Sequence, residues 1–201
     1  MIYFNRGSTS GWIFIALMLL IMAIFQQLDI RDLRYQPNWW IEAEYWRSFT
    51  AHWVHANEKH LLLNAGGLML CMTIASPKWP VWRWVVYNIV LALGISTLFT
   101  LRNPELNWYV GYSGILFGIY LLAAIDLYRR DRAIALLLGA AMVLKVVLEQ
   151  FSDIRTDSGD LIGVPVIIDA HLYGLLLGLS IALTQRVYTI WLGRDNASTW
   201  S

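Results

Sequence analysis

The sequence has little charge and almost no cysteine. Only 14% of its 201 residues are Asp, Glu, Lys or Arg, whereas 58% are hydrophobic. Soluble domains carry about 25% charged residues, so this composition argues against a soluble protein and indicates an integral membrane protein. Cys71 is the only cysteine, which excludes an internal disulfide and a CxxC-type metal site.

Several binding signatures are also absent. The formal net charge is +1, which does not provide the basic face that nucleic-acid binding needs. No GxGxxG, GxxxxGK[ST] or HExxH run is present, so we expect no nucleotide partner. His52, His55 and His60 could be proposed as metal ligands, but their spacing suits one face of an interfacial helix equally well. We therefore expect no nucleic acid, no metal and no cofactor.

Six mostly apolar segments approach the 20 or so residues that a membrane-spanning helix needs. They cover residues 11–28, 60–76, 81–101, 112–128, 133–151 and 167–185. The sequence therefore predicts an all-α, polytopic membrane protein with a six-helix bundle in one domain over residues 1–201. The basic turn Arg129-Arg130-Asp131-Arg132 lies between the fourth and fifth segments. By the positive-inside rule it places that turn, and with it both termini, in the cytoplasm.

The connection between the first two segments, residues 29–59, is long, polar and rich in tryptophan. Tryptophan and tyrosine collect at membrane–water interfaces, so we expect most of its aromatic side chains to anchor this segment in the interface. Its aromatic residues include Trp39, Trp40, Tyr45, Trp46, Phe49 and Trp53. A connection of this size in a compact domain is usually functional or disordered.

Four polar side chains fall at a similar depth near the outer surface in this topology. His60 and Asn64 lie at the outer end of the second segment, Ser113 at that of the fourth, and His171 about one turn into the sixth. Polar groups inside a membrane are costly, and their presence suggests function. Each one alone could be a packing residue bonded to a backbone carbonyl. Chance would scatter them in depth, so we expect them to form one site.

These residue types suit acyl transfer. A serine hydroxyl becomes a good nucleophile when a base such as a neutral imidazole takes its proton. Asn64 follows His60 by four residues, so both face one side of their helix and could help to bind a developing oxyanion. Gly111 and Gly114 permit close backbone approach around Ser113.

No third member of a catalytic triad is evident. Asp169 lies two residues before His171, on a different helix face, and we interpret it as an interfacial or capping carboxylate. Lys145 and Glu149, at i and i+4 in the fifth segment, are expected to pair with each other or to extend toward the surface. A proton-relay role for them is the alternative. The sequence thus predicts a Ser113–His171 dyad.

Taken in order, the motifs resemble those of the rhomboid family of intramembrane serine proteases. They are Trp46-Arg47, His60-x-x-x-Asn64, Gly111-x-Ser113-Gly114, and Ala170-His171 followed by Gly174 and Gly178. The resemblance implies that Ser113 is the nucleophile, that His171 is the general base, and that His60 and Asn64 bind the oxyanion.

The resemblance also bears on packing around the site. Gly174 and Gly178 would let the sixth segment pack closely against the fourth, as small-xxx-small patterns do. The position four after the nucleophile, often a tyrosine in rhomboids, is Phe117. Phe117 would keep the stacking on His171 and lose any hydroxyl contact.

Within the family, the chain looks most like the rhombosortases. The cues are residues 60–64, Lys145-x-x-x-Glu149-Gln150 and residues 166–174. The resemblance implies a subfamily site that includes Lys145, Glu149 and Gln150. It also implies substrates anchored in the membrane by a C-terminal signal, which consists of a Gly-Gly motif, a hydrophobic span and basic residues. The implied location is the bacterial inner membrane, as a multi-pass protein in contact with the lipid bilayer.

The predicted function is therefore that of an intramembrane serine endopeptidase that cleaves near the outer face. Three alternatives stay open: a general rhomboid protease for single-pass proteins, a rhomboid-like pseudoprotease that binds membrane helices, and a small transporter or channel. The intact Ser113 and His171 argue against a pseudoprotease. The lack of an internal inverted repeat argues against a transporter.

Overall fold

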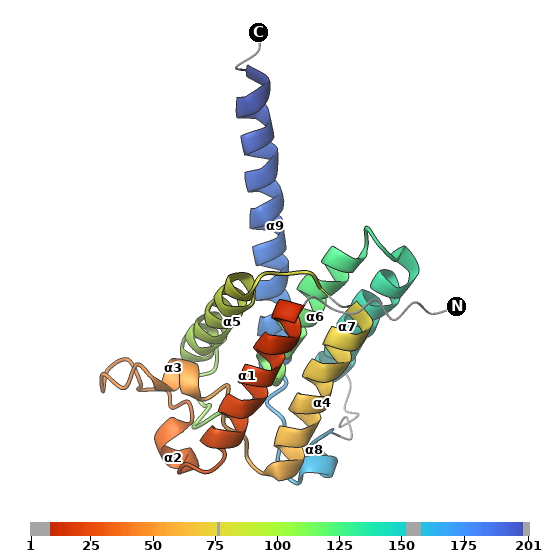
Figure 1. The fold of residues 1–201 in the computed structure, drawn as a ribbon. Helices are drawn as coiled ribbons and strands as arrows, with labels where there is room; N and C mark the ends of the chain where they lie inside the picture. The colour runs from red at the N-terminus through yellow and green to blue at the C-terminus, as the bar shows by residue number, and fades with distance from the viewer. Residues whose placement is uncertain (1–8, 76, 152–157, 199–201) are drawn as a thin grey trace.

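The computed structural model describes residues 9–75, 77–151 and 158–198, and six long helices make up most of this part of the chain (Figure 1). They are α1 (Thr9–Phe25), α4 (Glu58–Ala75), α5 (Val81–Arg102), α6 (Ser113–Leu127), α7 (Arg132–Phe151) and α9 (Asp169–Ser198). Three short helices are α2 (Ile30–Leu33), α3 (Arg47–Thr50) and α8 (Ser158–Ile162). The described residues contain no β-strand, so the predicted all-α class is confirmed for them.

The six long helices coincide with the six predicted segments. Among the helices described, α5 and α7 are the ones long and apolar enough to qualify as membrane spans by length and composition. Six spans therefore stay a prediction. The predicted end of the second segment, Ser76, lies outside the described residues.

The helix ends follow local chemistry. Asn57 caps α4, because its side-chain oxygen accepts a hydrogen bond from the His60 N–H at 3.0 Å. Pro80 precedes α5 with a φ of −66°, a value that its ring imposes. The last helix, α9, continues well past the predicted end at residue 185 and extends beyond the rest of the bundle (Figure 1). No proline interrupts residues 186–198.

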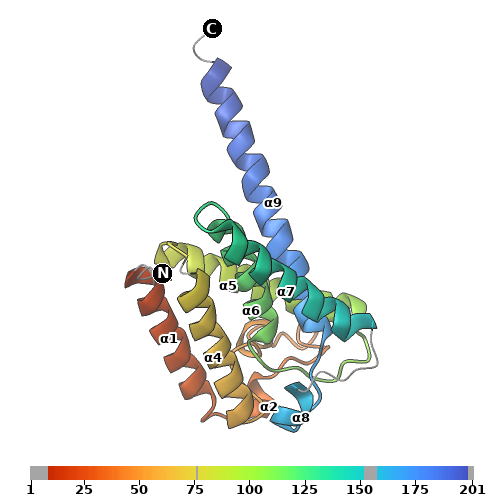
Figure 2. The same cartoon turned by 90° about the vertical axis from the view of Figure 1, so that its right-hand side faces the viewer.

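Helix α6 lies at the centre of the bundle, and most of its side chains are buried. It packs against α4, α5, α7 and α9. Figure 2 shows α1 and α4 side by side at one edge, while α7 crosses in front of α6. The short helices α2, α3 and α8 gather at one end of the bundle, and the turn between α6 and α7 lies at the other (Figure 1).

Glycines bring α6 and α9 into close contact. A Cβ added at Gly174 would lie 1.9 Å from the carbonyl oxygen of Gly114, and one at Gly178 would lie 2.9 Å from that of Gly118. The close packing that we expected between these two segments is therefore present, and it depends on the missing side chains. It also places the start of α9 directly beside the start of α6.

The segment between α1 and α4 has a buried side that we did not expect. Trp40, Tyr45 and Trp46 are exposed, as interfacial anchors would be. Trp53, in contrast, is 2% exposed and stacks on Phe49 with ring centroids 4.0 Å apart. Trp53 is therefore not one of the anchoring residues, because it packs inside the protein.

Buried Arg47 holds together the segment between α1 and α4. Its guanidinium pairs with Glu44 and donates to the carbonyl oxygens of Arg31 at 2.7 Å and Arg34 at 3.2 Å. The hydrogen bond from Arg47 holds the pKa of Glu44 below its ordinary value, although burial acts in the opposite direction. A buried charge needs such partners, so Arg47 fixes the fold of a long connection that has little regular structure.

Candidate active site

Ser113 is the first residue of α6, and the loop before it is held in an uncommon conformation. Gly111 has a φ of +121°, which glycine adopts without a steric penalty. Its N–H donates to the carbonyl oxygen of Ala51 at 2.9 Å, and its carbonyl accepts from the Tyr109 hydroxyl at 2.6 Å. These bonds set the position of Ser113 at a helix N-terminus, where backbone N–H groups lack intrahelical partners.

His171 lies in the first turn of α9, and the structure brings it to Ser113. Its Nε2 is 3.0 Å from the Ser113 Oγ, within the range that nucleophile activation needs. Phe117, one turn along α6 from Ser113, stacks on the imidazole with ring centroids 4.3 Å apart and an interplanar angle of 11°. The stacking expected from the resemblance is therefore present.

The other nitrogen of His171 contacts a carboxylate. Its Nδ1 lies 2.7 Å from the Oε2 of Glu149 on α7, and the Glu149 Oε1 lies 2.8 Å from the Nζ of Lys145. The expected Lys145–Glu149 pair is present. No third triad member was evident from the sequence, yet α7 directs the Glu149 carboxylate toward His171 at the start of α9. An acidic residue inside a predicted span was the signal that could have found it.

His60 and Asn64, both on α4, make different contacts. The His60 ring lies against Gly111, where an added Cβ would be 2.6 Å from the His60 Cε1, and His60 lines the same cavity as Ser113. Asn64 is buried one turn further along α4, and its amide donates to the His60 carbonyl at 3.1 Å. In this geometry His60 faces the Ser113 region, whereas Asn64 bonds to its own helix.

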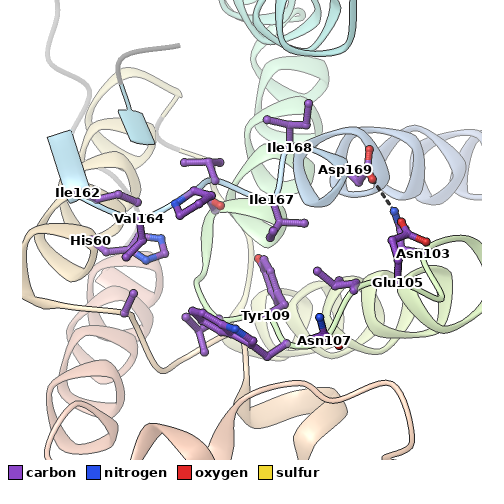
Figure 3. Close-up of a pocket in the computed structure, with 17 residues that line it drawn as sticks. His60, Asn103, Glu105, Asn107, Tyr109, Ile162, Val164, Ile167, Ile168 and Asp169 are labelled. Carbon is purple, nitrogen blue, oxygen red and sulfur yellow. Dashed lines mark hydrogen bonds between the residues drawn. The ribbon is translucent and has the colours of Figure 1, made fainter. Parts of the chain in front are cut away.

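Ser113 opens into a cavity of about 430 Å³ (Figure 3). The cavity lies among the start of α4, the loop between α5 and α6, and the segment that leads into α9. Its lining combines polar groups with an apolar wall, and includes His60, Asn103, Glu105, Tyr109, Ile162, Val164, Ile167 and Asp169. Asn57 links two of its walls by donating to the carbonyl oxygen of Ile162 at 2.7 Å.

Asp169 joins three helices beside the cavity instead of contacting His171. Its carboxylate accepts from Asn103 at 2.6 Å (Figure 3) and also from Gln150 at 3.2 Å. The Tyr173 hydroxyl donates to the same Asn103 at 2.6 Å. Asp169 therefore ties the ends of α5 and α7 to the start of α9. Gln150, which we had grouped with a subfamily site, takes part in this link.

Tyr109 also lies in the site, and no motif indicated it. Burial raises the pKa of its phenol well above the ordinary value, although hydrogen bonding with the Gly114 backbone and the Ser113 hydroxyl acts in the opposite direction. The phenol is therefore neutral and lies beside the proposed nucleophile. Tyr109 precedes the glycine-framed serine by four residues in an irregular loop, so sequence periodicity gives no information about where it points.

The three histidines considered as metal ligands do not all converge, because the His55 and His60 ring centroids lie 5.1 Å apart whereas His52 contacts Ser96. Helix α3 ends at Thr50, before His52 and His55, so the interfacial-helix interpretation is wrong for them. His52 Nε2 is 3.1 Å from the Ser96 Oγ, whose own hydrogen is donated to the Ser48 carbonyl, so the ring must donate. Burial lowers the pKa of His52 and of His55 to about 3. Within the described ranges, no group of three or more His, Cys, Asp or Glu could hold a metal ion.

Comparison with models of protein families matches residues 42–187 to the Rhomboid domain. The match covers α3 to α8 and most of α9, and so includes every residue of the site described above. No curated protein matches the chain.

Proposed function

The chain belongs to the rhomboid family of intramembrane proteases, and from that premise we propose that it is a serine endopeptidase that cleaves membrane-anchored proteins. The observation that carries the proposal is the 3.0 Å separation between the Ser113 Oγ and the His171 Nε2. Two side chains 58 residues apart in sequence meet, and one of them, Ser113, lines a cavity. A packing role would not require that meeting.

In the proposed reaction, the Ser113 Oγ attacks the carbonyl carbon of the scissile peptide bond while the His171 Nε2 takes the hydroxyl proton. The imidazolium then gives this proton to the leaving amine, and an acyl-enzyme remains on Ser113. A water molecule, activated by the same imidazole, hydrolyses the ester and restores the serine. These steps need no metal or cofactor, and the residues present supply each proton transfer.

The developing oxyanion requires hydrogen-bond donors. We propose that the backbone N–H groups at the start of α6 and the His60 ring provide them, with Gly111 and Gly114 allowing the close approach. The contact between His60 and Gly111 supports this assignment, because it holds the imidazole beside the loop of the nucleophile. Asn64 would act through His60, since its amide already donates to the His60 carbonyl.

We further propose that the substrates carry a C-terminal Gly-Gly motif followed by a hydrophobic span and basic residues, as in rhombosortase processing. A helical carbonyl is already hydrogen-bonded, so a substrate must unwind at the cut site, and glycine favours this because it destabilises a helix by about 1 kcal/mol relative to alanine. The residues that carry this resemblance, Lys145, Glu149 and Gln150, lie around His171 and Asp169. The enzyme would then act at the outer face of a bacterial inner membrane, as a six-span protein with both termini in the cytoplasm.

The test is cleavage by the purified protein in liposomes. Two substrates that share one hydrophobic span and one basic tail would be compared, the first with Gly-Gly before the span and the second with Leu-Leu. We expect cleavage of the first at least about tenfold faster, with the cut located by mass spectrometry. Equal rates would reject the Gly-Gly preference and favour a general rhomboid protease. No cleavage, together with no labelling by a fluorophosphonate, would favour a pseudoprotease.

Gly111→Ala is expected to reduce kcat by about 100-fold, comparable to the loss of an oxyanion donor. The added Cβ would meet the His60 ring at 2.6 Å, and the backbone φ of +121° is strained for alanine. Such strain costs on the order of 1–3 kcal/mol, so the melting temperature should also fall. The matched control is Gly139→Ala in α7, where nothing lies within 4 Å of the added Cβ. A Gly111→Ala protein with wild-type kcat would exclude His60 and this loop from the site.

A further inference from the structure

We propose that Glu149 is the positioning residue for the general base, so that the site works as a Ser113–His171–Glu149 triad whose carboxylate is neutralised by Lys145. This inference rests on the proposed protease function and goes beyond it, because a serine–histidine dyad was expected. The contacts run from Lys145 and Glu149 on α7 through His171 on α9 to Ser113 on α6. The Lys145 Nζ–Glu149 Oε1, Glu149 Oε2–His171 Nδ1 and His171 Nε2–Ser113 Oγ distances are 2.8 Å, 2.7 Å and 3.0 Å.

Each oxygen of the Glu149 carboxylate has a different partner. Oε1 contacts the Lys145 ammonium, and Oε2 contacts the Nδ1 of His171. The two residues of α7 are separated by four positions, so the helix itself aligns them. A simple surface ion pair would leave the second oxygen to solvent, whereas here it is directed at the imidazole.

Burying the Glu149 carboxylate costs free energy unless charged or hydrogen-bonding partners compensate for it. The Glu149 side chain is 1% exposed and that of His171 is 4% exposed. A buried carboxylate that loses its partner is strongly destabilising. The Lys145 side chain remains 34% exposed, so its aliphatic stem can reach inward while the ammonium stays near water. Lys145 thus supplies the compensating charge without being fully desolvated.

The chemistry of the contact sets the histidine tautomer. An ionised carboxylate can only accept hydrogen bonds, so the proton of the neutral imidazole lies on Nδ1. Nε2 is then unprotonated and can accept the Ser113 hydroxyl proton. When Nε2 takes that proton, the carboxylate stabilises the resulting imidazolium and itself remains ionised. Phe117 limits rotation of the ring by stacking on its face.

The test is Glu149→Gln in the full-length protein in liposomes. Glutamine preserves the shape of the side chain but removes the charge and can donate to Nδ1, which favours the wrong tautomer. We expect kcat to fall by about 10²–10⁴-fold while KM changes less than threefold, and the rate of fluorophosphonate labelling of Ser113 to fall in parallel. Glu149→Asp should recover part of kcat. Lys145→Met should lower kcat more than Lys145→Arg, which keeps the charge.

A matched control comes from the opposite end of the bundle. Asp126 near the end of α6 and Arg130 in the following turn form an i, i+4 ion pair at 2.9 Å, so Asp126→Asn removes an ion pair of the same spacing away from Ser113 and should leave kcat unchanged. Leu138→Ala on α7 provides a second control, since it opens a cavity in the core and lowers the melting temperature without touching the charges. If kcat followed the melting temperature across all these variants, the carboxylate would be merely structural and the proposal would be overturned.

The outcomes separate this inference from the proposed function. A Glu149→Gln protein that cleaves at the wild-type rate, beside an inactive Ser113→Ala protein, overturns the triad and leaves the protease intact. An active Ser113→Ala protein overturns the protease proposal itself. Should Glu149→Gln fail to accumulate, the comparison of Lys145→Met with Lys145→Arg decides the question, and equal kcat values for these two count against the proposal.

Discussion

Ser113→Ala is expected to abolish cleavage, with a loss of kcat on the order of 10⁴-fold or more. The substitution removes the atom that would form the acyl-enzyme and leaves only substrate binding and the oxyanion donors. The protein should remain folded, because the substitution removes only the hydroxyl group and, with it, the hydrogen bond to His171. The measurement is the initial rate of cleavage in liposomes, together with loss of fluorophosphonate labelling.

The matched control for this variant is Ser180→Ala. Ser180 lies on the exposed face of α9, and its hydroxyl donates to the Leu176 carbonyl of its own helix. Removing that hydroxyl should leave cleavage unchanged, because such a bond within a helix contributes little to stability. His171→Ala should resemble Ser113→Ala, since loss of the base leaves the hydroxyl unactivated. A Ser113→Ala protein that cut at the wild-type rate would show that the reaction uses another nucleophile.

The lengths of the apolar runs could predict the helices, because each run ends at polar residues or at proline. Pro80 and Asn57 fix the starts of α5 and α4, and both signals can be read without a structure. The meeting of Ser113 and His171 was also predictable, because the predicted six-span topology would place both at a similar depth. The structure brings the two side chains to 3.0 Å from each other.

The direction in which a side chain points was harder to predict. Glu149 stands out as an acidic residue inside an apolar run, but Lys145, four residues earlier, already explains it locally, so the pattern does not show that it also contacts His171. Tyr109 lies in an irregular loop, where no periodicity relates position to direction. Trp53 could not be distinguished from its interfacial neighbours, since composition alone does not separate a tryptophan at the membrane surface from one in the core.

The glycine contacts link packing to catalysis. Gly114 follows Ser113 directly, and Gly174 lies one turn along α9 from His171. The closest approach of the two helices therefore occurs next to the two reacting groups. Any change that separates α6 from α9 must also lengthen the contact between the Ser113 Oγ and the His171 Nε2. The interface thus sets the geometry of the dyad as well as the stability of the bundle.

Gly174→Ala is accordingly expected to cause a large loss of both stability and activity. The added Cβ would lie 1.9 Å from the Gly114 carbonyl oxygen, an overlap with backbone that a side-chain rotation cannot relieve. Overpacking of this kind typically costs 1–3 kcal/mol or more, and a displacement of about 1 Å can lower a rate by about 100-fold. Thermal denaturation in detergent and cleavage in liposomes would measure the two effects.

Substitutions at Gly178 and Gly66 serve as comparisons for Gly174→Ala. At Gly178 the added Cβ would lie 2.9 Å from the Gly118 carbonyl, one turn further from the site. Gly178→Ala should therefore lower the melting temperature while affecting kcat less than Gly174→Ala does. At Gly66 on α4 nothing lies within 4 Å, and Gly66→Ala should be neutral or slightly stabilising. If Gly174→Ala matched Gly66→Ala in both measurements, close contact between α6 and α9 could not be what holds the serine and the histidine together.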